Sequence, residues 1–173
     1  QTELGFIKHV LSTYIGKNIQ LVPTIHTTKI VKSGTNFKGG VTTYHRIEKE
    51  IFNLLADSSA CAVTTMFDYY GLPHDFPGFS SKSGDCYKQI MQLEKAFADK
   101  ITNNKFIPYI QLHEFEALLF SAPEVIDTIM LGKKLTNSNL KKIRENYRTP
   151  EEINDDPITA PSKRIEGVYS DYQ

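Results

Sequence analysis

The chain has 173 residues, of which 40% are hydrophobic and 23% are charged, so it is long enough to bury a substantial core. Twenty basic residues balance twenty acidic ones, which excludes a net field that would draw the whole molecule to nucleic acid or to an anionic membrane. Two cysteines are too few for a disulfide-stapled secreted scaffold, and no run approaches the roughly 20 apolar residues of a membrane span. We therefore expect one soluble domain over residues 1–173, in the cytoplasm.

In chain order, hydrophobic periodicity predicts helices that alternate with short β-prone runs. The expected helices cover residues 2–16, 42–56, 87–101, 113–120, 123–130 and 138–147, with one more short turn at 149–152. The expected strands cover residues 19–25, 60–67 and 106–112, and a loop is expected at residues 32–40. The run at 60–67 is apolar without alternation, which is typical of a strand covered on both faces. This order predicts an α/β fold with a mainly parallel sheet covered by helices, followed by a helical C-terminal part.

Acidic residues gather where the carboxyl ends of these strands are expected. Asp68 directly follows the strand at 60–67, while Glu114 and Glu116 follow the strand at 106–112. Glu3 lies in the first turn of the first helix. Ligands of parallel sheets bind beyond the carboxyl ends of the strands, and carboxylate oxygens suit a hard cation such as Mg²⁺ or Mn²⁺. We therefore expect Glu3, Asp68 and one of the two later glutamates to share a cation.

A purely structural role is the alternative for each of these acids. Carboxylates in the first turn of a helix are stabilised by the helix dipole with or without a metal, and Asp68 could act as a local cap. On a regular α-helix Glu114 and Glu116 would project about 160° apart. Only one of them is then expected to face the site. Glu114 is the first choice because it is nearer the strand end, and Glu116 is the reserve, as a salt-bridge or supporting residue.

Basic residues that could contact a phosphate occur in two places. Lys163 and Arg164 follow Pro161 at an expected helix start, where N–H groups and basic side chains can hold an anion. Lys38 precedes a glycine pair in the expected loop, and His113 beside Glu114 could position a ligand. Most Lys-Arg pairs are simply solvated at the surface, and most histidines have a structural role. The histidines show no metal-site spacing, and no serine lies in a nucleophile elbow, so neither a zinc enzyme nor an acyl transferase is favoured.

Several stretches of the sequence match a known family pattern. They are residues 1–3, 38–41, 64–73, 75–78, 106–120 and 151–165, and they include TTMFDYYGLP from residue 64 and FIPYIQLHEFEALLF from residue 106. On these words the chain resembles a bacterial family named domain of unknown function 4276 (DUF4276), which is similar to Toprim domains. The resemblance implies a Toprim-like fold with about four parallel strands and a nuclease-like metal site, as in nucleases that work beside ATPases in phage defence.

The resemblance also implies a role for particular residues. Glu3 would match the acidic residue that follows a Glu-Gly pair on the first strand. This pair would stand just before residue 1, so that strand is expected to be missing here, and the C-terminus is expected to be short for the family. Asp68 would match the first member of an Asp-x-Asp pair, but Tyr70 occupies the second position. A residue of the 114–116 segment would match the later glutamate, and Lys163 the basic residue of related nucleases.

Two functions follow from these residues. The leading hypothesis is a Mg²⁺- or Mn²⁺-dependent nuclease or related phosphoryl-transfer enzyme of the Toprim type, with Asp68, Glu114, Glu116 and Lys163 as catalytic residues. Its expected partners are a nucleic acid substrate and an ATPase of the AAA or ABC type. The alternative is a non-catalytic module that docks on such an ATPase, which the zero net charge and Tyr70 favour. An aspartyl phosphatase is disfavoured, because no acid follows two residues after Asp68.

Overall fold

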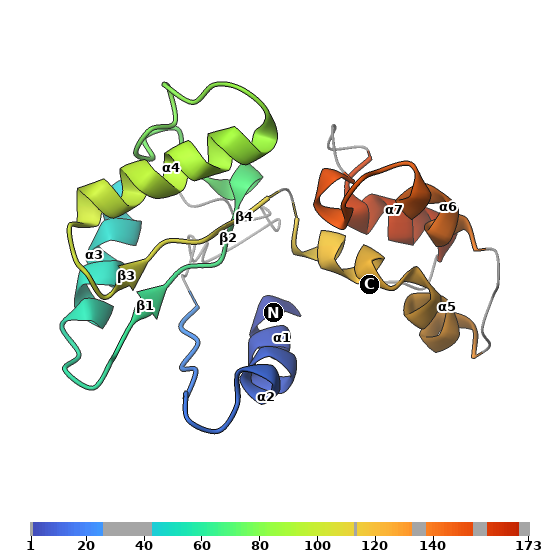
Figure 1. Ribbon diagram of the computed structural model, residues 1–173, viewed down its shortest axis with the longest axis horizontal. Helices are drawn as coiled ribbons and strands as arrows, with labels where there is room; N and C mark the ends of the chain where they lie inside the picture. The colour runs from blue at the N-terminus through green and yellow to red at the C-terminus, as the bar shows by residue number, and fades with distance from the viewer. Residues whose placement is uncertain (1, 26–42, 113, 133–137, 154–158, 170–173) are drawn as a thin grey trace, which may run out of the picture.

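The computed structural model of the chain describes residues 2–25, 43–112, 114–132, 138–153 and 159–169 (Figure 1). Its α-helices are α1 (Thr2–Phe6), α2 (Ser12–Ile15), α3 (Tyr44–Leu55), α4 (Cys86–Ile101), α5 (Pro123–Leu131), α6 (Asn139–Glu145) and α7 (Pro161–Val168). Its 3₁₀ turns are η2 (Tyr69–Gly71), η3 (Phe115–Ser121) and η4 (Pro150–Glu152), and a π-helical turn η1 (Ile7–Leu11) joins α1 to α2. The strands are β1 (Val63–Thr64), β2 (Phe67–Asp68), β3 (Phe106–Ile107) and β4 (Ile110–Gln111).

The strands form two parallel pairs. β1 pairs with β3, with Val63 opposite Phe106, and β2 pairs with β4, with Asp68 opposite Gln111. Between the pairs the ladder is interrupted at Pro108, which has no N–H to donate. The Thr65 hydroxyl bridges the gap, because it accepts from the Tyr109 N–H at 3.0 Å and donates to the Tyr109 carbonyl at 2.9 Å. The predicted α/β class and parallel pairing are confirmed, and the described strands are short pairs rather than one wide sheet.

Two of the sequence predictions need correction in detail. Residues 19–25 lie outside helices and strands, and Val22 and Ile25 expose 77% and 62% of their surface, so the predicted strand is wrong. Pro23 within this run cannot donate to a ladder. The segment after β4 is the 3₁₀ turn η3 rather than an α-helix, and Glu114 before it is extended. The loop predicted at residues 32–40 lies outside the described residues.

The larger hydrophobic core lies where α3 and α4 pack on the strand pairs (Figure 1). Its centre is Phe97 of α4, which is fully buried. The Phe97 ring meets three other rings at their edges, with centroid distances of 5.9 Å to Tyr44, 4.7 Å to Phe76 and 4.8 Å to Phe106. Edge contacts of this kind add to the free energy gained from burial alone. This packing fixes α4 against the segment that carries β3 and β4.

A second core holds the C-terminal helices together, which confirms the predicted helical C-terminal part. Its buried residues are Phe120, Ile126, Leu140, Ile153, Ile165 and Tyr169. The Tyr169 hydroxyl donates a hydrogen bond to the buried carboxylate of Asp127, and burial together with this contact raises the pKa of Tyr169 to about 12. The pair therefore joins α5 to the residue that ends α7.

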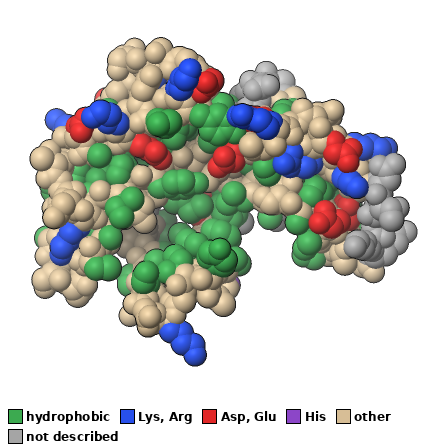
Figure 2. Space-filling view, viewed as in Figure 1, with side chains coloured by type: hydrophobic (Ala, Val, Ile, Leu, Met, Phe, Trp, Pro, Cys, Tyr) green, Lys and Arg blue, Asp and Glu red, His purple; other side chains and the backbone are tan. Residues whose placement is uncertain are grey.

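The N-terminal segment carries hydrophobic side chains on its surface, as Figure 2 shows at the bottom of the molecule. Among its residues Val10 and Tyr14 are 55% and 88% exposed. None of the described helices is long and apolar enough to cross a membrane.

We predict that Phe97→Ala lowers the free energy of unfolding by about 3–5 kcal/mol, because it leaves a large cavity at the junction of three rings. Chemical denaturation monitored by circular dichroism measures this change. Phe52→Ala is the matched control, since Phe52 is 46% exposed on α3 and its loss is expected to change the stability by less than about 1 kcal/mol. Equal effects of the two substitutions would contradict the assignment of Phe97 to the centre of the core.

Candidate functional site

Asp68 lies at the carboxyl end of β2, where the chain turns into η2. Its strand partner Gln111 is fully buried, and the Gln111 amide donates to the Leu112 carbonyl at 3.3 Å while its oxygen accepts from the Tyr109 hydroxyl at 2.6 Å. The backbone N–H of Phe115 donates a hydrogen bond to the Asp68 carboxylate. The end of β2 is therefore tied to the segment that follows β4, and Asp68 is only partly exposed.

Glu3 reaches the same region through the packing of the first helix. The ring of Phe6 meets the ring of Phe115 edge-on, with 5.2 Å between the centroids. Residues three apart lie on one face of a helix, so Glu3 shares the face of α1 that Phe6 presents to η3. This contact holds together two acidic segments that lie more than a hundred residues apart in the sequence.

Glu114 and Glu116 both belong to this region. Glu114 is extended, so the divergence expected for two glutamates on a regular α-helix does not apply. The Glu114 carboxylate accepts from the Ser162 hydroxyl at 2.9 Å and from the Ser162 N–H at 3.3 Å, at the start of α7. Glu116 is in the first turn of η3 and is partly buried. We call Glu3, Asp68, Glu114 and Glu116 the carboxylate cluster.

The carboxylates of the cluster are partly buried and repel one another. The pKa of Asp68 is raised to about 7, and burial is the largest cause. Repulsion by Glu3, Glu116 and Glu114, in decreasing order of effect, also raises this pKa, whereas the hydrogen bond from the Phe115 N–H lowers it. Burial also raises the pKa of Glu116, with further contributions from Glu114 and Glu3. Mutual repulsion of this kind shows that the carboxylates share one region.

Oxygen donors of this type suit Mg²⁺ or Mn²⁺ in their chemistry. Within the described parts of the chain, however, no three His, Cys, Asp or Glu side chains are arranged so that they could hold one ion. The carboxylates are near enough to repel one another, but their oxygens do not converge on a single position, and Ser162 engages Glu114. A shared cation would therefore require the side chains of the cluster to turn toward it.

The basic residues predicted to contact a phosphate are engaged elsewhere. The Lys163 ammonium lies 2.6 Å from a carboxylate oxygen of Glu166, one helical turn further along α7. The Arg164 guanidinium donates to the Thr159 carbonyl at 2.6 Å and to the Tyr147 hydroxyl at 2.8 Å. The contacts of both cations are thus with residues of the C-terminal part of the chain. Lys38 and His113 lie outside the described residues.

Two groups of the site were not among the predicted residues. Ser162 lies at the start of α7, and it is Ser162 rather than its basic neighbours that contacts a cluster residue. The N–H of Phe115 is the donor to Asp68, and no sequence signal reveals such a backbone contact. Tyr70, which stands where a second aspartate was sought, is 53% exposed and its ring packs against Tyr69 at 5.6 Å between centroids.

Comparison with protein families identifies the chain. The model of the family called domain of unknown function (DUF4276) matches residues 1–173. The chain therefore belongs to the DUF4276 family. Neither the search of curated proteins nor the search of solved structures found a match.

We predict that Asp68→Asn makes the protein more stable at neutral pH. Because the folded-state pKa of about 7 lies above the ordinary value of 3.8, the folded state keeps a proton that the unfolded chain releases, and wild-type stability falls as the pH rises through this window. Asparagine cannot ionise but can still accept from the Phe115 N–H. The free energy of unfolding of the variant relative to wild type should therefore rise by roughly 2 kcal/mol from about pH 4 to about pH 8, with solvent screening allowed for. Denaturation of both proteins at each pH measures this difference.

The matched control is Asp99→Asn, which removes a carboxylate from an exposed i,i+4 pair with Lys95 at 2.9 Å. Exposed pairs contribute little, so this variant should follow the wild-type pH profile to within about 1 kcal/mol. A stability difference between wild type and Asp68→Asn that is the same at both pH values would show that the folded protein does not raise the pKa of Asp68.

Proposed function

We propose that this chain is a divalent-metal-dependent nuclease or related phosphoryl-transfer enzyme of the Toprim type. The observation that supports it is the meeting of carboxylates from α1, the end of β2 and the start of η3. Burial, together with repulsion by these neighbours, raises the pKa of Asp68 to about 7. A cluster of uncompensated negative charge is relieved by a cation. Its position at the carboxyl end of a parallel strand pair is where ligands bind in α/β folds.

In this proposal Glu3, Asp68 and Glu114 hold Mg²⁺ or Mn²⁺, and Glu114 also fixes the start of α7 through Ser162. The bound ion would neutralise charge on the phosphodiester and lower the pKa of a water molecule. Glu116 is the residue we propose as proton carrier, because a carboxyl whose pKa is raised toward neutrality can both accept and donate a proton.

Lys163 would contact the substrate phosphate by exchanging partners. Its present ion pair with Glu166 is exposed, with 44% of each side chain accessible. Pairs of this kind contribute about 1 kcal/mol or less, so a dianionic or bridging phosphate near Ser162 could compete for the ammonium. The N-terminus of α7 would add N–H donors on the same side.

The remaining parts of the proposal concern partners. A nucleic acid is the substrate class, and an ATPase of the AAA or ABC type, acting in phage defence, is the proposed partner. Zero net charge supports the need for a partner, because the chain alone lacks a positive field that would hold a polyanion.

A second candidate is a non-catalytic module of the same ATPase assembly. Two observations favour it: the described carboxylates are not arranged around a common ion position, and Tyr70 stands where Toprim sites have a second aspartate. In this case the cluster would contribute to docking or regulation rather than to hydrolysis.

We predict that the protein cleaves nucleic acid only with Mg²⁺ or Mn²⁺, and that Asp68→Asn or Glu116→Gln lowers the rate at least about 100-fold, since each removes a ligand or a proton carrier. The assay follows plasmid, single-stranded DNA and RNA on gels, with and without the purified ATPase partner. Asp99→Asn should retain wild-type activity. Metal-dependent cleavage that survives both cluster substitutions would refute this site, and no cleavage of any substrate with the partner present would favour the non-catalytic module.

A further inference from the structure

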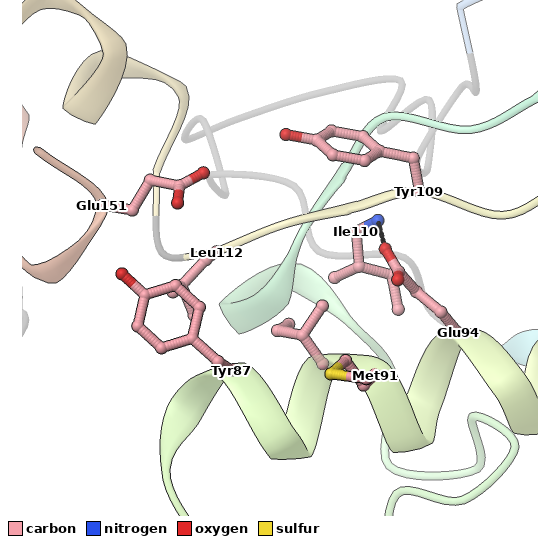
Figure 3. Close-up of a pocket in the computed structure, with 8 residues that line it drawn as sticks. Tyr87, Met91, Glu94, Tyr109, Ile110, Leu112 and Glu151 are labelled. Atoms are coloured by element: carbon pink, nitrogen blue, oxygen red, sulfur yellow. Dashed lines mark hydrogen bonds between the residues drawn. The ribbon is translucent and has the colours of Figure 1, made fainter. Parts of the chain in front are cut away.

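A cavity of about 260 Å³ lies between α4, the segment of β4 and the turn η4 (Figure 3). One wall is apolar and is formed by Ile90, Met91, Ile110 and Leu112. Met91 is 68% exposed, which leaves its flexible side chain at the surface of α4. The wall therefore suits an aliphatic chain, since methionine and branched side chains adapt to such a ligand.

Two carboxylates and two tyrosines complete the lining. Glu94 comes from α4 and accepts from the Ile110 N–H at 2.9 Å through one of its oxygens, while Glu151 comes from η4 on the other side of the cavity. Burial raises the pKa of Glu94. Burial and then the charges of Glu151 and Glu94 raise the pKa of Tyr109. Both carboxylates thus act electrostatically on the Tyr109 hydroxyl, which donates a hydrogen bond to the Gln111 side chain at 2.6 Å.

Among the described residues that line the cavity, none is lysine or arginine. Arg148 lies outside, over the ring of Tyr87 at 5.7 Å, and its guanidinium is 3.0 Å from a carboxylate oxygen of Glu152. Figure 2 shows acidic side chains set among hydrophobic ones along the middle of this face. Negative charge, aromatic rings and an apolar wall are thus open to solvent in one place.

We propose that this cavity binds the side chain of an arginine presented by a partner polypeptide. The apolar wall takes the aliphatic stem, the ring of Tyr109 offers a face for the planar cation, and Glu94 and Glu151 accept its N–H groups. A nucleic acid is excluded as occupant, because the two carboxylates repel phosphate. An arginine held here would bridge α4 and η4, and so the two hydrophobic cores.

The probe is the peptide acetyl-Gly-Arg-Gly-amide, titrated into the full chain and followed by NMR chemical shifts, with the citrulline peptide as its neutral counterpart. We expect the arginine peptide to bind and to shift signals of α4 and η4, and the citrulline peptide to bind at least about tenfold more weakly. Glu94→Gln keeps an acceptor for the Ile110 N–H but removes the charge. This substitution and Glu151→Gln should each weaken arginine binding at least about tenfold.

Glu124→Gln is the matched control, because Glu124 is exposed on α5 and away from the cavity lining. It should bind the peptide like the wild type. Equal binding of the arginine and citrulline peptides would overturn the proposal. Loss of binding in Asp68→Asn with retention in Glu94→Gln would also overturn it, since the cation would then occupy the carboxylate cluster. None of these outcomes depends on nuclease activity.

Discussion

The parallel pairing of residues 63–68 with residues 106–111 is the constraint on which the rest of the site depends. It sets Asp68 opposite Gln111, so that the strand bearing the aspartate ends beside the segment that leads into η3. The pairing survives the loss of a donor at Pro108 because the Thr65 hydroxyl supplies the missing contacts. The rings around Phe97 then hold α4 on the same segment.

Pairing of this kind brings like charges together, and the fold offsets their repulsion only in part. The Phe115 N–H and the Ser162 hydroxyl each stabilise one carboxylate of the cluster, but burial and mutual repulsion leave Asp68 with a pKa of about 7. Proteins seldom keep such a group where an apolar or neutral residue would fit. The strain is consistent with a ligand that carries positive charge, and this reasoning underlies the proposed function.

The sequence was most informative where local pattern and packing agree. The apolar spacing from Tyr44 to Leu55 and from Cys86 to Ile101 predicted α3 and α4 because each buries one continuous face. The strand expected at residues 19–25 was wrong, since a β-prone run needs a neighbour and Pro23 removes a donor. The gathering of Asp68 and the 114–116 segment was predicted from strand ends, and Glu3 was added from its place in the first turn of the first helix. The hydrogen bonds between Glu114 and Ser162 span 48 residues and have no local signal. The Lys163–Glu166 pair did have one, because its i,i+3 spacing is that of helical ion pairs.

The most direct test of the central claim is to map a paramagnetic cation on the protein. In a titration of the ¹⁵N-labelled chain with Mn²⁺, the account predicts that amide signals around residues 3, 68 and 114–116 broaden first, and that Mg²⁺ in excess restores them. The same titration of Asp68→Asn should need a markedly higher Mn²⁺ concentration. Broadening that begins elsewhere, or that spreads evenly over exposed acidic residues such as Asp99, would contradict the claim that the carboxylate cluster is a cation site.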